Sequence, residues 1–411
     1  MAKKKTTTKK PPEQSPTKNA GKKDTSNGGT KTKTTEDSAQ KKSSSKTSQT
    51  TKKSSEVKST SKKKTTTSSL KKTSTTHTPK TTLKQPVKKT TTKKSTPKPA
   101  KTDQQTPEQI QEEKERIEAY KKAGTIAKKL KALVKPKIVP GAKLIEIVEF
   151  AEKKIIELGG KPGFPVNISI NNVAAHYTPP PGDTTEIQDG DIIKFDHGVH
   201  IDGYCVDTAF TISLNNDTAL KNIVKASEEA VEKAIKKIKH GVTTNILGGV
   251  IEETVRKYGF KPIINLQGHR IERWDLHAGK SIPCIALPTG DTMEEGEIYA
   301  VEVFVSNGEG EIHAQQSNAQ IFQLIPTTRK IPLRTKSSRR ILGYIAREFK
   351  SLPFSRFQVH QEFPQGSFGL LELIKTNKLE KHNILSEKKG FYVAQTEETI
   401  LVTKNGCEIL T

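Results

Sequence analysis

Apolar residues recur at helical spacing in four stretches, all of them beyond residue 105. The first stretch opens with Thr-Pro-Glu at 106–108, where a threonine followed by proline is typical of a helix start. Its apolar stripe runs from Ile110 to Leu130, and we expect this helix to end before Pro136. The same spacing predicts three more helices, at 144–158, 219–239 and 244–258, closed by Gly159, Gly241 and Gly259.

Between these helices lie runs that are rich in β-branched and aromatic residues, which favours strands. The predicted strands are Val166–Ile170, Ile192–Val199, Tyr204–Leu214, Ile298–Ser306 and Tyr392–Thr403. Asp202-Gly203 separates two of them and is a hairpin signal, so the sheet should be antiparallel there. This pattern favours an α+β fold over a doubly wound sheet, and no short internal repeat is evident.

A different pattern covers residues 318–390, between the last two predicted strands. Basic helical segments appear there, around 337–350 and 368–376. We interpret 318–390 as a helical, winged-helix-like subdomain inserted into the larger domain at 106–411.

The first 105 residues have no apolar periodicity and no Phe, Trp or Tyr. They contain 29 Lys, no Arg and six acidic residues, so this segment carries +23 of the net charge of +25. Such a composition cannot bury enough surface to offset chain entropy, and we predict that 1–105 is a disordered basic tail.

Other features of the composition narrow the class of protein. Lysines follow Met1 with no apolar stretch, and nowhere do about 18 apolar residues run together, so we expect a cytosolic chain without a membrane span. The three cysteines, Cys205, Cys284 and Cys407, are far apart and lack CxxC spacing. A disulfide framework or a thiolate zinc site is therefore not expected.

Two aspartates flank the predicted hairpin. If the turn is Asp202-Gly203, Asp196 pairs with Ala209 and Asp207 lies one diagonal step away; if the turn is Ile201-Asp202, the two aspartates are directly opposed. Either register places both carboxylates on one face within about 8 Å. Close carboxylates repel unless a cation neutralises them, although paired aspartates near a turn are more often solvated turn residues.

Three further polar residues change that balance. His269 follows a glycine step, and Glu302 and Glu397 each interrupt an apolar strand, where an unpaired carboxylate is costly. Together with the aspartates they form a mixed oxygen and nitrogen set that suits two bridged divalent ions.

With these motifs the chain resembles the methionine aminopeptidases of type 2, which have the creatinase-like "pita-bread" fold. The motifs that carry the resemblance are Phe195-Asp196-x-Gly198, Asp207-Thr208-Ala209, Gly268-His269, Val301-Glu302-x-Phe304 and Gln395-x-Glu397-x-Thr399. The resemblance implies that the five residues named above bind two metal ions, with Asp207 and Glu397 bridging both. The resemblance covers 106–411. The residues in the motifs are closer to those of archaeal members, whereas the basic tail is similar to that of eukaryotic members.

The resemblance also implies a reaction. Metal-activated hydroxide would attack the carbonyl after an initiator methionine, with Glu302 as proton shuttle and His176 and His277 beside the scissile amide. Phe164 and Leu276 resemble the apolar walls that receive the methionine side chain, so the second residue should be small. The metals could be Co, Mn, Fe, Ni or Zn, because the ligand set accepts several.

Three positions depart from the family pattern, His197, Gln320 and His382, and they bear on specificity. Two alternatives stay open: a proline-directed aminopeptidase of the same fold, and a homologue that binds RNA or the ribosome. We expect a monomer that acts on nascent polypeptide N-termini, without membrane contact, and whose tail binds the ribosome or RNA.

Overall fold

The computed structural model describes residues 106–316, 318–327 and 329–411. The predicted disordered tail at 1–105 lies outside the described residues. Within them, a capping box at Thr106 and Gln109 opens the first helix, with Pro107 at its first position, as predicted.

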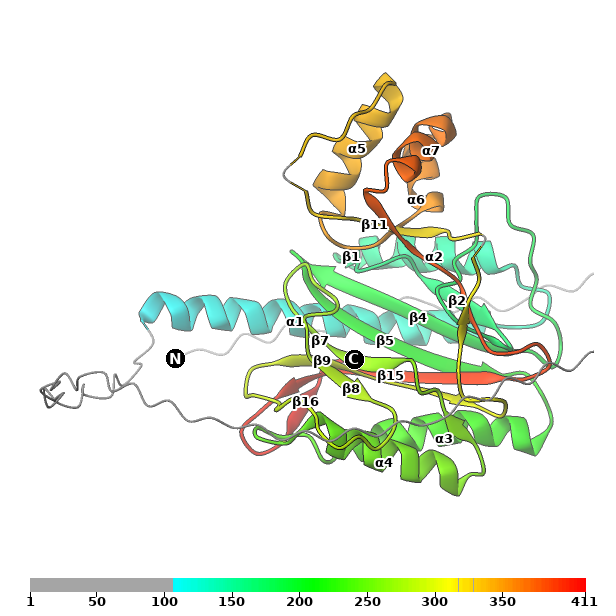
Figure 1. Cartoon of the computed structure of the whole chain (residues 1–411), viewed down its shortest axis with the longest axis vertical. Helices are drawn as coiled ribbons and strands as arrows, with labels where there is room; N and C mark the ends of the chain where they lie inside the picture. Colours follow the sequence, from blue (N-terminus) through cyan, green and yellow to red (C-terminus); the bar gives the residue numbers. More distant parts are fainter. Residues whose placement is uncertain (1–105, 317, 328) are drawn as a thin grey trace, which may run out of the picture. The chain divides into compact units, whose positions relative to one another are not determined.

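One large antiparallel sheet organises the described part of the chain (Figure 1). Its main path is β1 (Lys161–Pro162), β4 (Ile192–Ile201), β5 (Tyr204–Ser213), β15 (Val393–Val402), β9 (Ile298–Ser306), β7 (Gln267–Ile271) and β8 (Ser281–Pro283). Three strands join it from the side: β2 (Asn167–Ile170) pairs with β4, β6 (Lys261–Pro262) with β9, and β16 (Cys407–Ile409) with β15. The α+β expectation is confirmed.

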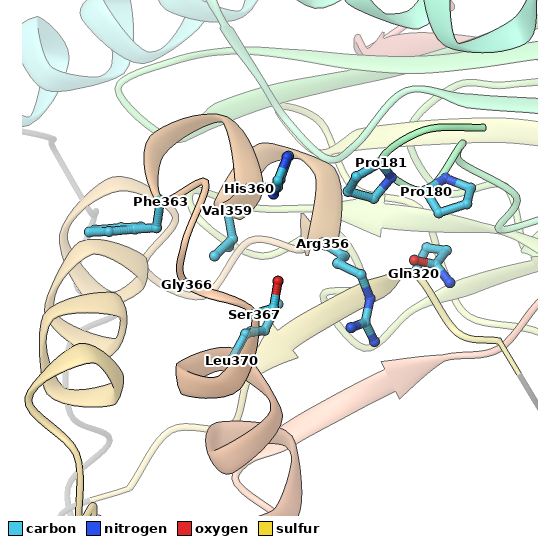
Figure 2. Close-up of a pocket in the computed structure, with 10 residues that line it drawn as sticks. All are labelled: Pro180, Pro181, Gln320, Arg356, Val359, His360, Phe363, Gly366, Ser367 and Leu370. Atoms are coloured by element: carbon cyan, nitrogen blue, oxygen red, sulfur yellow. The ribbon is translucent and has the colours of Figure 1, made fainter. Parts of the chain in front are cut away.

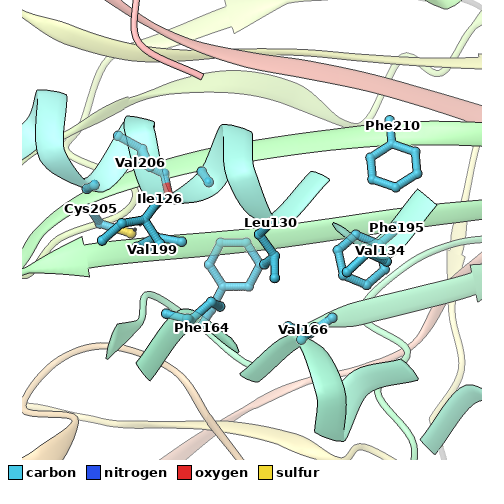
Figure 3. Close-up of a cluster of buried hydrophobic side chains, with 14 of the residues drawn as sticks. Ile126, Leu130, Val134, Phe164, Val166, Phe195, Val199, Cys205, Val206 and Phe210 are labelled. Carbon is cyan, nitrogen blue, oxygen red and sulfur yellow. Dashed lines mark hydrogen bonds between the residues drawn. The ribbon is translucent and has the colours of Figure 1, made fainter. Parts of the chain in front are cut away.

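Four helices cover one face of this sheet. They are α1 (Pro107–Val134), which runs into a short 3-10 helix (Lys135–Lys137), α2 (Leu144–Glu157), α3 (Thr218–Ile235) and α4 (Thr244–Lys257). Ile126 and Leu130 of α1 share a buried cluster with Phe195 and Val199 of β4 (Figure 3). No helix within the described residues combines the length and apolarity that crossing a membrane requires.

The helices α3 and α4 pack against the other half of the same face. Their buried side chains cluster with Val301 and Val303 of β9. Register through β15 places these valines on the same side as Phe195, because Asp196, Ala209, Glu397 and Glu302 face one another across the opposite side. The helices therefore leave that opposite side of the sheet to other segments.

The two halves of the fold repeat each other. The helices α2 and α4 both have 14 residues and start 100 residues apart, at Leu144 and Thr244. Each is followed by a glycine with positive φ, Gly159 or Gly259, and then by a Lys-Pro strand that pairs with a long strand of the sheet. The sequence shows no short repeat because this duplication spans about a hundred residues and preserves conformation more than residue identity.

The segment between β9 and β15 forms its own small core. It contains β11 (Ile321–Leu324), α5 (Lys336–Glu348), β12 (Phe354–Ser355), α6 (Arg356–Glu362), α7 (Ser367–Lys375) and β13 (Leu379–His382). Both predicted helices of this insert are confirmed, and α6 was missed. The insert also holds a three-stranded antiparallel sheet, β12-β11-β13, in addition to its helices.

A second small sheet lies where the insert meets the body. It consists of β10 (His313–Ala314), β14 (Leu385–Ser386) and β3 (Val173–Ala175). Residue Glu387, directly after β14, accepts a hydrogen bond from Asn172 through its backbone carbonyl. The strand β3 leads directly to His176, so this sheet anchors one side of the candidate site described below.

The hairpin between β4 and β5 turns at Asp202-Gly203, with φ of 47° and 87°. Two successive positive φ angles are the mark of a type I′ turn, which the Asp-Gly sequence favours. Asp196 consequently pairs with Ala209, and the first of the two predicted registers is correct.

Candidate metal centre

Five polar side chains meet on the side of the sheet that the four helices leave free. Strand pairing explains the meeting: Ala209 opposes both Asp196 and Glu397, Glu397 opposes Glu302, and Ala300 opposes His269. Directly opposed residues in an antiparallel pair point to the same face. The structure therefore brings together all five residues that the motifs singled out, namely Asp196, Asp207, His269, Glu302 and Glu397.

The tightest part of this group is formed by Asp207, His269 and Glu397. Each offers one ligand atom, and these atoms all lie within 4.8 Å of one another. The Nε2 atom of His269 is 3.7 Å from Oδ2 of Asp207. Three strands that are distant in sequence, β5, β7 and β15, supply the three side chains.

Burial perturbs the protonation of these groups. Burial, only partly offset by the hydrogen bond from Asn167, raises the pKa of the Asp196 carboxyl to about 6. Burial, and then the charges of neighbouring carboxylates, raises the pKa values of Asp207, Glu302 and Glu397 well above the usual range. Burial lowers the pKa of His269 to about 3, so its imidazole is neutral.

The oxygen atoms of this group fit a bound cation. Among the residues that the structure describes, Asp196 Oδ1, Asp207 Oδ1 and both carboxylate oxygens of Glu397 are buried and have no hydrogen-bond partner. Buried oxygens without donors are costly unless a positive charge satisfies them. Carboxylates with a neutral imidazole are ligands that divalent transition metals accept.

A cavity of about 530 Å³ opens onto this group. Its walls include the proposed ligands except Glu397, which is 1% exposed and lies beneath the floor. All four residues predicted to contact substrate also line it: Phe164, His176, Leu276 and His277. The cavity thus joins an apolar wall to a polar floor, a composition that is common in ligand-binding sites.

His176 adopts a backbone conformation that is uncommon for a residue with a side chain, with φ of 63°. Its Nδ1 atom is 3.2 Å from the carbonyl oxygen of Asn383. A carbonyl only accepts, so Nδ1 carries the hydrogen and Nε2 is left with a lone pair. Burial lowers the pKa of His176 to about 4, which keeps the ring neutral. Strained backbone at a cavity wall favours a functional role over a purely structural one.

His277 lies against His269, with the two ring centroids 4.3 Å apart. Its backbone N–H donates to Oδ1 of Asp275 at 3.0 Å. Burial lowers the pKa of His277, so this ring too is neutral near pH 7.

The three positions that depart from the family pattern lie in three different places. His197 is fully buried on the helix side, with Nε2 3.4 Å from the carbonyl of Ala127, so it does not reach the cavity. Gln320 lines a separate cavity of about 290 Å³, together with Pro180 and Arg356 (Figure 2). Only His382 lines the main cavity, where its ring meets that of His176 edge-on at 5.6 Å.

Two further polar residues contact the proposed ligands: Asn167 was not identified from the sequence, and Gln395 was named only as part of a motif, without a role. Asn167 pairs with Asp196 across β2 and β4 and donates to its Oδ2 at 3.1 Å. Gln395 donates through Nε2 to Oε1 of Glu302 at 3.0 Å. The signal that identified Glu302, a polar residue within an apolar strand, was present at both positions.

Comparison with known proteins agrees with this geometry. The profile of metallopeptidase family M24 matches residues 118–404. The chain is 45% identical over 297 residues to a methionine aminopeptidase of Thermococcus onnurineus, covering 72% of this chain and 99% of that protein. It is 33% identical over 313 residues to methionine aminopeptidase 2 of Verticillium alfalfae, covering 71% and 70%.

The fold is similar to that of solved structures. A thermophilic Arx1 matches with a TM-score of 0.62 at 23% identity, over 72% of this chain and 90% of that one. At this identity the likeness concerns the fold alone, and it agrees with the pita-bread fold that the resemblance implied. The higher identity to the archaeal protein also agrees with the wording of the motifs. The profile match, the two relatives and the fold agree, and the chain belongs to metallopeptidase family M24.

Proposed function

We propose that this protein removes the N-terminal methionine from nascent polypeptides whose second residue is small. The observation that carries this proposal is the meeting of four carboxylates and a neutral histidine at the floor of a cavity with an apolar wall. The relatives named methionine aminopeptidase, at 33% and 45% identity, support the same activity.

The five clustered side chains would hold two divalent ions, and Asp207 and Glu397 would be the residues that contribute to both. Ions held there supply Lewis acidity and lower the pKa of water toward neutrality. The identity of the metal stays open among Co, Mn, Fe, Ni and Zn, because this ligand set suits each of them.

The remaining roles follow from the hydrogen bonds around the cavity. Gln395 holds Oε1 of Glu302, which leaves Oε2 to accept a proton from the attacking water and return it to the leaving amine. Nε2 of His176 has a lone pair and accepts the N–H of the scissile amide. A neutral His176 in this tautomer cannot donate to the developing oxyanion, so that part of its expected role passes to His277.

The apolar walls set the proposed specificity. Phe164 and Leu276, each 7% exposed, line the cavity beside the polar floor and receive the methionine side chain. The space beside a filled pocket then admits only a short second side chain.

A panel of short peptides tests this proposal. Met-Ala and Met-Gly peptides should be cleaved with kcat/KM at least about 100-fold above Met-Leu and Ala-Pro peptides, since poor fit costs a few kcal/mol. Faster cleavage of Xaa-Pro would favour the proline-directed alternative. No cleavage of any peptide by metal-loaded protein would favour a binding homologue.

We further propose the setting in which the enzyme acts. Residues 1–105 would be a basic tail that precedes, in the sequence, a catalytic domain at 106–411 with its insert at 318–390. The substrate emerges from ribosomes in the cytosol, and a segment with +23 of charge suits contact with ribosomal RNA. We propose a monomer, since the candidate site is complete within one chain.

A further inference from the structure

The two strands that carry Asp207 and Glu397 are joined in an unusual way. Strand β15 pairs with β9 along nearly its whole length, and β4 pairs with β5 in the same manner. Between β5 and β15, in contrast, there is a single backbone pair, Glu397 with Ala209. Threonine side chains make the remaining connections.

On one side of that pair, the side-chain hydroxyl of Thr399 replaces the backbone hydrogen bonds that would otherwise join the two strands. Its hydroxyl accepts the backbone N–H of Asp207 at 2.7 Å and donates to the backbone carbonyl of Asp207 at 2.6 Å. The backbone of Thr399 turns elsewhere: its N–H donates to the hydroxyl of Thr411 at 2.8 Å, and its carbonyl accepts from Leu410 at 2.9 Å.

On the other side, Thr211 makes the mirror-image connection. Its hydroxyl accepts the backbone N–H of Gln395 at 2.8 Å and donates to the carbonyl of Gln395 at 2.7 Å. A third hydroxyl, that of Thr208, donates to the carbonyl of Glu397 at 2.8 Å. The two proposed metal ligands on these strands, Asp207 and Glu397, are thus each bonded through the backbone to a threonine hydroxyl.

The chemistry of the hydroxyl explains why threonine serves here. One O–H can donate to a carbonyl while its oxygen accepts an N–H, so a single atom satisfies both groups that the opposite strand would otherwise pair. An inserted oxygen also keeps the backbones farther apart than a direct N–H···O=C bond would. Thr399 and Thr208 are fully buried, so water cannot easily replace these contacts.

We propose that Thr399 and Thr211 are positioning residues that set the spacing of the Asp207 and Glu397 carboxylates, and through it the affinity for divalent ions. The two threonines lie at corresponding distances on either side of the central pair, one on each strand. Thr399 fixes the backbone of Asp207 itself. Thr211 fixes the backbone of Gln395, which lies two residues before Glu397 on the same strand. This inference rests on the proposed metal site and adds the residues that hold its ligands at their separation.

The test is titration of the metal-free protein with Co²⁺, followed by visible absorption of the bound ion and by calorimetry. Thr399→Val keeps the side-chain shape and removes the hydroxyl, and we expect Co²⁺ affinity to fall by about tenfold or more. Thr399→Ser keeps the hydroxyl and should stay within about threefold of the unmodified protein. Recovery by serine separates positioning from simple loss of packing.

Thr396→Val is the matched control, because Thr396 lies on the same strand and bonds Ser227 of α3 at 2.8 Å on the helix-covered face. Its Co²⁺ affinity should not change. If Thr399→Val does not fold, Thr211→Val tests the same role on the other strand. Thr399→Ser and Thr211→Ser should both bind Co²⁺ with normal affinity.

Unchanged Co²⁺ affinity in folded Thr399→Val, or an equal loss in Thr396→Val, would overturn the positioning role and leave the metal site intact. A serine variant that binds as weakly as valine would also overturn it. Absence of Co²⁺ binding by the unmodified protein would instead remove the proposed metal site, and this inference with it.

Discussion

Four carboxylates share one buried site, where neighbouring negative charges add to burial in raising the pKa values of Asp207, Glu302 and Glu397. The neighbours that raise the pKa of Glu397 after burial are Asp207, Glu302 and Asp196. Such a group is unfavourable in the folded protein unless protons or cations neutralise it. Binding of divalent ions should therefore stabilise the fold as well as enable the reaction.

Metal removal tests that coupling. At a free ion concentration about 100-fold above Kd, a single site adds about 2.7 kcal/mol to the free energy of unfolding. We expect thermal denaturation of chelator-treated protein to shift upward when Co²⁺ or Mn²⁺ is returned. Asp207→Asn should reduce that shift, and an equal shift in this variant would argue that the ions bind elsewhere.

Glu302 should be indispensable for turnover and dispensable for folding. Glutamine at this position can still accept the hydrogen bond from Gln395, yet it cannot take up a proton. We expect Glu302→Gln to lower kcat by two to three orders of magnitude, on the scale of about 100–1000-fold that such groups contribute, with an unchanged circular dichroism spectrum. The exposed Glu294→Gln serves as control. A Glu302→Gln enzyme with near-normal kcat would exclude the proposed proton transfer.

At this scale the sequence predicts charged residues better than neutral ones. Glu302 and Glu397 were identified because a carboxylate in an apolar strand is costly, whereas threonine is ordinary in a strand, and Thr399 was named only as part of a motif, without a role. Gln320 illustrates a second limit, because its neighbour Ile321 lines the main cavity while Gln320 itself faces another. Strand direction at that point depends on tertiary packing.

Between elements, the most distinctive contact joins α2 to α6 of the insert. Glu152 is 7% exposed and accepts hydrogen bonds at Oε1 from the side chain of Gln358 at 3.0 Å and the backbone N–H of Val166 at 3.4 Å. Burial raises the pKa of Glu152 from 4.5 to about 7. The protonated form is therefore favoured in the folded state.

This raised pKa makes the stability of the protein depend on pH. The contribution of Glu152 is fully present below pH 4.5, falls as pH rises from there, and is lost above about pH 7. Glu152→Gln stays neutral at every pH, so above pH 7 it should be more stable than the unmodified protein by up to about 3 kcal/mol. Urea denaturation at pH 4.5 and pH 8 measures the difference.

Glu149→Gln, one turn earlier on an exposed face of α2, is the control and should not change stability at either pH. A Glu152→Gln variant that is less stable than the unmodified protein at pH 8 would show that the ionised carboxylate is satisfied after all. A gain of equal size at both pH values would point to packing in place of ionisation.

Helices and strands were predictable where local residues mark the ends of the element. The strand at Ile298–Ser306 was placed at its observed bounds, and α2 and α4 each end two residues before a glycine with positive φ. Short elements were missed because their stability comes from neighbours: α6 has seven residues, and β12 has two. The duplication of the two halves concerns their arrangement and was equally invisible to local patterns.

Over the whole molecule, charge is divided unevenly. Residues 1–105 carry +23, so residues 106–411 carry only +2. Within that part, 318–390 holds 14 Lys and Arg against five acidic residues, and the remainder is consequently net negative. Residues 1–105 and the insert at 318–390 are therefore the two regions that would attract polyanions.

We expect the tail to tether the enzyme to ribosomes without taking part in catalysis. Its lysine clusters lack aromatic residues for base stacking, so contacts should be to phosphate and independent of sequence. Deletion of 1–105 should leave kcat/KM for Met-Ala peptides unchanged, because all the proposed ligands lie beyond it, and should lower cosedimentation with ribosomes. Association of the full chain should weaken steeply between about 50 and 200 mM salt as counterions are released.

Two controls locate the tether. Replacement of the tail lysines by glutamine keeps its length and removes its charge, and this variant should behave like the deletion. Substitution of Arg339, Arg340 and Arg347 on the exposed face of α5 by glutamine removes their positive charge and tests the insert in the same assay. Equal cosedimentation of the full and shortened chains at low salt would exclude the tail as the tether, and loss of binding in the α5 variant alone would assign that role to the insert.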